Sequence, residues 1–197
     1  MDERDPSSGK IPLATAADAG APSARRAPFS AMAYLIALLA LACLAVLPRL
    51  FPHTHGMVGK PAPDATFTVA ANGAAGSKMR LADLKGRPVL LDFWASWCGP
   101  CGMVAPIVDR VARRYEARGL VVMGVNVDDA PSTIRAYSAA KGLRYPMVVD
   151  ADKQTSSRYG VSQLPTLVVI DREGNVRAFL TGLVDEAALN EILGAVM

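Results

Sequence analysis

The sequence is poor in cysteine and histidine, and this scarcity excludes several kinds of scaffold and site. Three cysteines among 197 residues are too few for a small secreted domain held together by disulfides. Both histidines, His53 and His55, precede residue 64. A structural zinc site needs about four Cys or His ligands, usually as two pairs. We therefore expect no metal site in the rest of the chain, and no cofactor.

The sequence also lacks a strong charge of one sign. Its 21 basic residues nearly balance 18 acidic ones and leave a net charge of +3. The basic residues do not cluster with aromatic ones, so we expect no nucleic-acid partner. Apolar residues make up 51% of the chain, which is enough for a packed core of ordinary size in one domain.

The N-terminal part divides into three segments. Residues 1–28 are rich in Ala, Pro, Ser and Gly without apolar periodicity, which predicts a disordered tail. Residues 29–47 carry no charge, and a helix of that length, at about 1.5 Å per residue, matches a hydrocarbon core about 30 Å thick. Arg25 and Arg26 precede this predicted transmembrane anchor and favour a cytoplasmic tail. Residues 48–63 contain several Pro and Gly and are predicted to be a linker.

A cleaved signal peptide and a buried core helix are the alternatives for residues 29–47. The apolar run is longer than a signal core of roughly 7–15 residues, and no small-x-small cleavage site follows it. A core helix beside a disordered tail would need a polar face, which this run lacks. Cys43 lies deep inside the run, where we expect an unreactive thiol facing lipid. The sequence therefore favours an uncleaved anchor.

Residues 64–197 alternate between strand and helix patterns, which predicts an α/β domain with a sheet covered on both faces. Apolar runs between turn residues predict strands at residues 66–70, 77–81, 88–94, 120–127, 145–149, 166–171 and 176–180. Helical spacing and stop signals predict helices at residues 100–118, 132–141 and 151–159, and a last one capped by Asp185.

Cys98 and Cys101 are separated by two residues and are predicted to exchange disulfides. That chemistry needs one thiolate to attack and a second thiol to release the mixed disulfide. Cys98 falls between a buried strand and a helix, whose N-terminus stabilises a thiolate. Pro100 suits the first turn of that helix, and Trp97 offers an apolar surface. The alternatives are half a zinc site, which lacks further ligands, and two unreactive core cysteines, which the Gly-Pro turn disfavours.

Asp92 interrupts the buried strand PVLLDFW at residues 88–94. A carboxyl among apolar residues tends to have a raised pKa and can carry a proton near neutral pH. We expect Asp92 to accept and return a proton for Cys101, through a water molecule. The alternative is that Asp92 points outward at the end of the strand.

Leu164-Pro165-Thr166 comes directly before the strand TLVVI. A proline at a strand entrance blocks ladder pairing. On residues alone, the Leu164–Pro165 bond is expected to be trans, because most X-Pro bonds are.

Two segments are very similar to thioredoxins: DFWASWCGPCGMVAPIVDRVA, which begins at Asp92, and YGVSQLPTLVVIDREGNV, which begins at Tyr159. The resemblance implies a thioredoxin fold with a mixed central sheet, in which Pro165 is cis and faces the cysteines. It also implies that Leu164 pairs with an extended substrate through its backbone. Gly182 falls near a family glycine that flanks the substrate groove, so the implied contact surface is Trp97, Gly99, Pro100, Leu164, Pro165 and Gly182.

The segment LADLKGRPVLLDFWASWCGPC and the extra helix and strand around residues 131–149 look like the TlpA/ResA branch. That branch is anchored in the bacterial inner membrane and faces the periplasm. Membership implies reduction of disulfides in exported proteins, such as apocytochrome c or copper-site proteins of oxidase assembly. The electrons would come from a transmembrane thiol carrier.

The chain departs from these patterns at three positions. Many members of the branch have Asn where this chain has Asp92. Thioredoxins often place Lys beside that Asp on the next strand, where this chain has Gly124, so Asp92 is expected to be harder to ionise. Position 102 is Gly where a basic residue is usual, so a weaker positive field is expected near Cys98.

Other activities remain as alternatives to a reductase. A net disulfide oxidase or isomerase would use the same cysteines, but the Gly-Pro dipeptide between them resembles that of reductants. A copper chaperone on a thioredoxin scaffold is suggested by His53, His55 and Met57. Those residues lie in or near the predicted linker, and the wider Cys spacing and late His of such chaperones are lacking. A peroxidase of the peroxiredoxin class would need a lone Cys after Pro and Thr, which the chain does not have.

Overall fold

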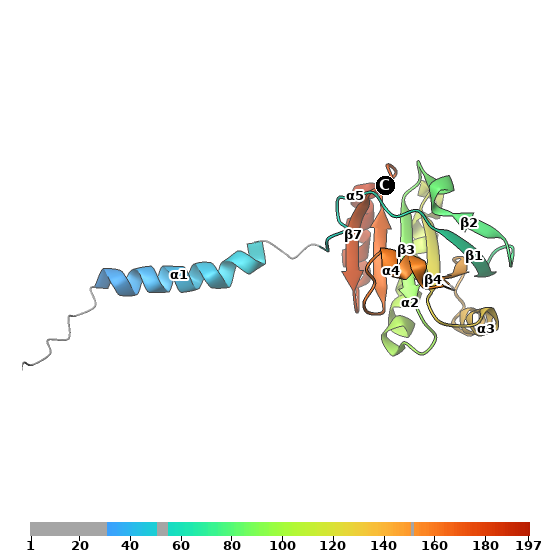
Figure 1. The fold of residues 1–197 in the computed structure, drawn as a ribbon, viewed down its shortest axis with the longest axis horizontal. Coiled ribbons are helices and arrows are strands. Elements are labelled where there is room, and N and C mark those ends of the chain that lie inside the picture. The colour runs from blue at the N-terminus through green and yellow to red at the C-terminus, as the bar shows by residue number, and fades with distance from the viewer. Residues whose placement is uncertain (1–30, 51–54, 151) are drawn as a thin grey trace, which may run out of the picture. The chain divides into compact units, whose positions relative to one another are not determined.

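The computed structural model describes residues 31–50, 55–150 and 152–197, and the chain divides into two compact units, Met1–Pro52 and His53–Met197. In the first unit, α1 (Ala31–Leu50) overlaps the predicted anchor (Figure 1). Its many Leu and Ala residues are good helix formers. Within the described ranges, no helix meets the length and apolarity required to cross a membrane. The anchor therefore stays a prediction, and the predicted tail at residues 1–28 lies outside the described residues.

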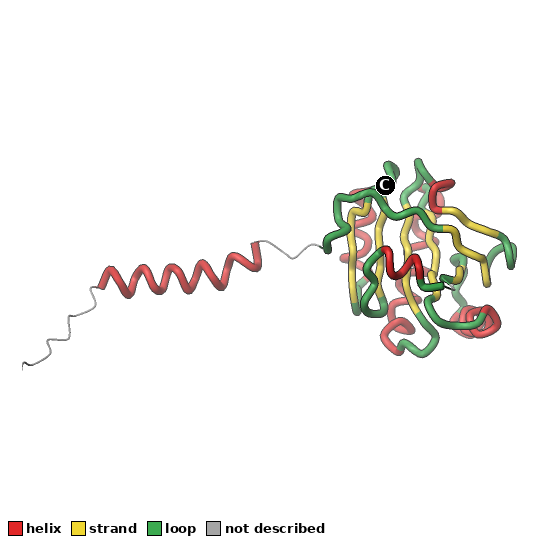
Figure 2. The backbone as a smooth tube through the Cα atoms, viewed as in Figure 1, coloured by secondary structure: helices red, strands yellow, loops and turns green. Residues whose placement is uncertain are grey.

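The second unit is built on one seven-stranded sheet with the order β2-β1-β5-β4-β3-β6-β7 (Figures 1 and 2). The strands β3, β4 and β5 run parallel, and every other neighbouring pair is antiparallel. The mixed sheet of the predicted thioredoxin fold is thus present. The strands are β1 (Thr66–Ala71), β2 (Lys78–Arg80), β3 (Val89–Trp94), β4 (Val121–Asn126), β5 (Met147–Val149), β6 (Thr166–Ile170) and β7 (Val176–Thr181).

Helices cover both faces of the sheet, as the strand and helix alternation predicts. One buried cluster lies between the sheet and α2, α3 and α5, and a second lies on the other face, with Phe67, Phe93 and Tyr159 among its members. Strand β3 is buried along its whole length because each of its faces is covered. The helices are α2 (Gly99–Tyr115), α3 (Pro131–Lys141), α4 (Gln154–Arg158) and α5 (Glu186–Val196), with short 3-10 helices η1 (Leu81–Leu84) and η2 (Glu116–Arg118).

The structure corrects several details of the predicted elements. The strand predicted at residues 77–81 ends at Arg80, because the chain turns into η1. The helix predicted at residues 151–159 spans only Gln154–Arg158. On α5, Asp185 caps the helix by accepting a hydrogen bond from the Ala188 N–H, as predicted.

Candidate active site

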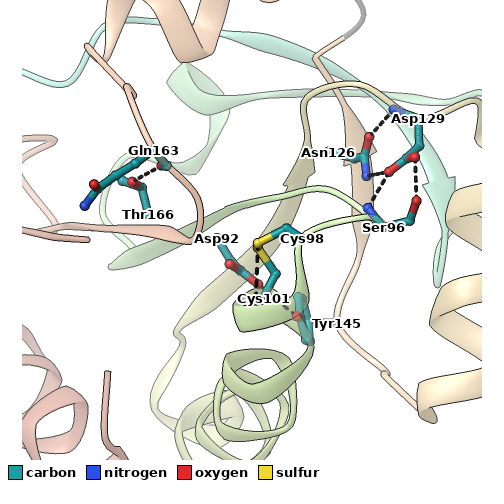
Figure 3. The surroundings of a disulfide bond; sticks show 9 residues. All are labelled: Asp92, Ser96, Cys98, Cys101, Asn126, Asp129, Tyr145, Gln163 and Thr166. Atoms are coloured by element: carbon teal, nitrogen blue, oxygen red, sulfur yellow. Dashed lines mark hydrogen bonds between the residues drawn. A yellow bond between two sulfur atoms is a disulfide. The ribbon is translucent and has the colours of Figure 1, made fainter. Parts of the chain in front are cut away.

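Cys98 and Cys101 form a disulfide at the point where β3 leads into α2 (Figure 3). Cys98 is the N-cap of α2, and its Sγ accepts a hydrogen bond of 3.2 Å from the Cys101 N–H. Pro100 occupies the first turn, where a missing N–H costs nothing. The helix N-terminus therefore presents partial positive charge to the Cys98 sulfur and stabilises its thiolate in the reduced protein.

A surface groove opens beside Cys98 and has a volume of about 580 Å³. Trp97 lines this groove, and 66% of its surface is exposed. Cys98 lines it although only 6% of its surface is exposed, whereas Cys101 does not line it and is 2% exposed, so a substrate disulfide in the groove meets Cys98 first. The lining residues include Trp97, Cys98, Gly99, Pro100, Gln163 and Leu164.

The predicted contact residues are partly gathered at this groove. Trp97, Gly99, Pro100 and Leu164 line it. The Leu164–Pro165 peptide bond is cis, so the expectation of a trans bond from residues alone was wrong, and the resemblance was the better guide. Pro165 and Gly182 do not line the groove, and the Gly182 N–H donates to the Pro165 carbonyl at 2.9 Å.

Lys153 and Asp128 form an ion pair of 2.7 Å at the rim of the groove. The hydrogen bond and charge of Lys153 lower the pKa of Asp128. The ion pair joins the residue before α4 to the loop that follows β4. The sequence carried no recognised signal for this contact.

Asp92 is buried beneath the cysteine pair, with 2% of its surface exposed, so the outward-pointing alternative is wrong. Burial raises the pKa of Asp92 to about 7. The Tyr145 hydroxyl donates a hydrogen bond to Oδ2 at 3.0 Å and partly opposes this rise. Figure 3 shows Asp92, Tyr145 and the two cysteines together around the disulfide. A carboxyl with a pKa near 7 can both take and release a proton at neutral pH.

Tyr145 was missed by the reasoning from sequence. It lies just before β5, two strands away from Asp92. Between them is Gly124 of β4, which pairs with Asp92 in the sheet. The only signal for this contact was the glycine itself, whose place beside Asp92 the resemblance had indicated.

A second polar network fixes the loop that enters the active site. The Ser96 N–H and hydroxyl both donate to the Asp129 carboxylate, at 2.7 and 2.6 Å, and Asn126 donates to it at 2.7 Å. Partial burial acts to raise the pKa of Asp129, but the bonds from Ser96 and Asn126 outweigh it and lower the pKa. An ionised Asp129 thus joins the end of β4 to the residues before Cys98.

Gly102 does not leave the start of α2 without a nearby cation. The Lys141 Nζ lies 3.8 Å, and the Tyr137 Oη 3.3 Å, from the point that a Cβ at position 102 would occupy. Both belong to α3. The expectation of a weaker positive field near Cys98 was based on position 102 alone. Lys141 of α3 places a cation beside that position.

The histidine and methionine cluster considered for copper is only partly described. His55 stacks on Phe179 with 3.5 Å between ring centroids, and its Nδ1 accepts a hydrogen bond from the Met57 N–H. His53 lies outside the described residues. In the part of the chain that the structure describes, no group of three or more His, Cys, Asp or Glu side chains could hold a metal ion.

Comparisons with known proteins agree with this geometry. Residues 58–179 match the AhpC/TSA family. The thiol-disulfide oxidoreductase ResA of Geobacillus thermodenitrificans is 31% identical over 168 residues, covering 84% of this chain and 94% of the relative. ResA of Bacillus subtilis is 31% identical over 121 residues, 61% of this chain and 68% of that protein.

Solved structures show the same fold. A Chlorobium tepidum protein assigned as the thiol:disulfide interchange protein DsbE superimposes with a TM-score of 0.65 and 33% identity, covering 71% of this chain and 96% of that one. A second thiol:disulfide interchange protein of that organism gives a TM-score of 0.61 with 26% identity, over 69% and 94% of the two chains. The chain therefore belongs to the AhpC/TSA family within the thioredoxin superfamily, and it is a thiol-disulfide oxidoreductase with a Cys98–Cys101 pair.

Proposed function

We propose that this enzyme reduces disulfides of exported proteins, with Cys98 as the attacking cysteine and Cys101 as the resolving one. The observation that carries this proposal is the unequal placement of the two sulfurs. Both cysteines are buried, but Cys98 lines the groove at a helix N-terminus, whereas Cys101 does not line it and lies on the side of Asp92. Such a pair passes two electrons to a substrate disulfide and closes into the disulfide that the structure holds.

The chemistry proceeds in two exchanges. The Cys98 thiolate attacks one sulfur of the substrate disulfide, that S–S bond breaks, and the released substrate thiolate takes a proton from water. The Cys101 thiol then gives its proton to Asp92, and its thiolate attacks the Cys98 sulfur. The mixed disulfide breaks, the second substrate thiolate leaves and is protonated, and the Cys98–Cys101 disulfide forms.

The physiological setting is part of the proposal. Residues 29–47 would anchor the protein in the bacterial inner membrane, with the catalytic domain in the periplasm. Apocytochrome c and copper-site proteins of oxidase assembly are the proposed substrates, and a transmembrane thiol carrier is the proposed electron donor. The similarity to ResA proteins and the uncharged segment support this setting.

The reduction potential of the Cys98–Cys101 couple tests the direction of transfer. The full-length protein, with Cys43 replaced by Ser to remove the one other thiol, is equilibrated against glutathione and dithiothreitol series. A value near −270 mV, about that of thioredoxin, supports a reductase. A value near −120 mV, about that of DsbA, would instead assign a net oxidase.

Membrane attachment is tested separately from the chemistry. We expect full-length protein expressed in bacteria to stay with the membrane pellet after alkaline carbonate washing, and a variant without residues 1–47 to be released. Release of the full-length protein would remove the anchor from the proposal and leave the exchange chemistry standing.

A further inference from the structure

Three neighbouring strands bring a tyrosine to the buried carboxyl. Strand β4 lies between β3 and β5, with Gly124 paired to Asp92 on one side and to Met147 on the other. Tyr145, just before β5, is 4% exposed. Its hydroxyl crosses β4 at Gly124 and donates to Asp92 Oδ2 at 3.0 Å. The bond joins residues 53 positions apart, so it depends on the register of the sheet.

Gly124 makes room for this crossing. A Cβ at position 124 would lie 3.0 Å from Tyr145 Cε2 and 3.2 Å from Trp94 Nε1, and would overlap the sulfur of Met147 at 2.5 Å. Contacts under 3.0 Å force neighbouring atoms to move. The Met147 side chain must move, and the Tyr145 ring must give by a few tenths of an ångström, which is enough to disturb a hydrogen bond in a densely packed core. Glycine at position 124 therefore leaves the space in which the Tyr145 ring crosses β4.

We propose that Tyr145 is a positioning residue for proton transfer, which holds the Asp92 carboxylate by Oδ2 so that Oδ1 is left to accept the proton of Cys101. The proposal rests on the proposed function, because it assigns a role within the second thiol exchange. The step balances as before: the proton leaves Cys101 Sγ for Asp92, and the electron pair of the S–H bond stays on sulfur for the attack on Cys98.

The hydrogen bond favours the charged form of Asp92. A phenol that donates to a carboxylate stabilises the anion, and this opposes the burial that raises the Asp92 pKa. Burial and the charge of Asp92 keep the pKa of Tyr145 well above its ordinary value, so the phenol remains a donor. Asp92 is thereby kept available as a base near neutral pH.

Few other titratable groups act on this pair. From α3, Tyr137 has a pKa raised by burial and by the charge of Asp92, and Lys141 lies over its ring. From α2, Asp109 acts on Tyr145 and is itself paired with Arg113 at 3.1 Å. The cysteine pair lies at the N-terminus of α2, with Cys98 as its N-cap, and β6 pairs the apolar Leu167 with Asp92. A pH effect of losing the Tyr145 hydroxyl is therefore carried by Asp92.

The variant Tyr145→Phe tests the proposal, because it removes one oxygen and keeps the ring. The full-length protein, reduced and carrying Cys43→Ser, is mixed with a model protein disulfide. The rate at which the mixed disulfide resolves and releases the second substrate thiol is followed from pH 5 to pH 9. We expect the midpoint of the rise with pH to move up by about one unit, and the rate at pH 7 to fall about fivefold. Gly124→Ala, which crowds the Tyr145 ring as well as Met147, should shift the midpoint in the same direction by a smaller amount.

Two controls separate positioning from stability. Tyr115→Phe also removes a hydroxyl from a buried tyrosine, one that donates to the Asn190 carbonyl at 3.3 Å, and should leave the midpoint unchanged. Asp92→Asn should remove the part of the pH dependence that belongs to Asp92 and leave only the ionisation of the thiols, and Tyr145→Phe should cause no further shift in that background. A carbon-13 titration of the Asp92 carboxyl in the reduced protein reports the same shift without any substrate.

The outcomes distinguish the two proposals. An unchanged Asp92 titration in both Tyr145→Phe and Gly124→Ala would overturn the positioning role, whatever the enzyme reduces. The Asp92 pKa could instead rise in both variants while the wild-type protein fails to reduce any disulfide. That result would support the positioning role of Tyr145 and overturn the proposed reductase. If Tyr145→Phe does not fold, the titration of Gly124→Ala decides the matter alone.

Discussion

The two sulfurs of one disulfide lie in different surroundings. On the outer side, Cys98 meets a groove, the N–H groups of a helix terminus and the exposed ring of Trp97. On the inner side, Cys101 is buried where Asp92 and Tyr145 form a hydrogen-bonded pair. The outer surroundings favour a thiolate at rest, and the inner ones favour a thiol that loses its proton on demand. One pair of chemically identical residues is thus divided into attacking and resolving roles by position.

The largest expected effect comes from removing each sulfur in turn. Cys98→Ser should abolish all exchange, because no attacking thiolate remains. Cys101→Ser should attack normally but fail to resolve, so that a mixed disulfide with the substrate accumulates. Non-reducing electrophoresis and mass spectrometry of full-length protein with Cys43→Ser would show the trapped adduct. An adduct trapped by Cys98→Ser through Cys101 would reverse the assignment.

Asp92→Asn should act only on the inner side. We expect the resolving step to slow about 100-fold at pH 8, where wild-type Asp92 is ionised and can act as a base, while alkylation of Cys98 changes little. Rapid-mixing kinetics that separate the formation of the mixed disulfide from its resolution would check this. An equal loss in both steps would show that Asp92 acts on the site as a whole.

The same residue predicts an unusual dependence of stability on pH. Asp92 has a pKa of 3.8 in the unfolded chain and about 7 in the folded one, so between those values the folded state binds the extra proton. The free energy of unfolding therefore falls as the pH rises from 4 to 7, by up to roughly 4 kcal/mol. Urea unfolding of the reduced wild type and Asp92→Asn should diverge over this range, with Asp92→Asn the more stable at pH 8. Parallel curves would contradict a raised pKa.

A smaller effect is expected at the loop that carries Cys98. Asp129→Ala removes the acceptor for the Ser96 N–H and hydroxyl, and should lower the free energy of unfolding by about 1–2 kcal/mol. Attack by Cys98 should slow a few-fold, since its loop is no longer joined to β4. Asp83 is exposed and lies in η1, outside this network, so Asp83→Ala is the control. Equal effects of the two substitutions would count against the network.

Features that depend on neighbouring residues could be predicted from the sequence. Signals carried by neighbouring residues were reliable. Pro100 and Cys98 lie at the start of α2, and Asp185 caps α5, where their local chemistry predicts. Burial of Asp92 followed from its apolar neighbours alone.

Contacts set by sheet register were beyond that reasoning. Tyr145 meets Asp92 only because β3, β4 and β5 align with Gly124 between them. In the same way Ser96 meets Asp129 because the ends of β3 and β4 are adjacent. The residues are 53 and 33 positions apart, and nothing in either local sequence indicates its partner.

The smallest effect is expected from Lys141, the cation of α3 that lies over Gly102. Because Lys141 is exposed, solvent screens its field. Lys141→Met should slow alkylation of Cys98 by less than about threefold, and the difference should fade at 1 M salt, where the screening length is about 3 Å. Lys85→Met, an exposed lysine beside η1, is the matched control. A loss of similar size in both variants would assign no role to α3.

The most direct test of the division between the cysteines is a competition between them in one molecule. Reduced full-length protein carrying Cys43→Ser is treated with a limiting amount of iodoacetamide at a series of pH values, and the modified cysteine is identified by mass spectrometry. We predict that Cys98 is alkylated first at every pH and with the lower apparent pKa, because it faces the groove and the helix N-terminus. Preferential alkylation of Cys101, or equal labelling of both, would contradict the account.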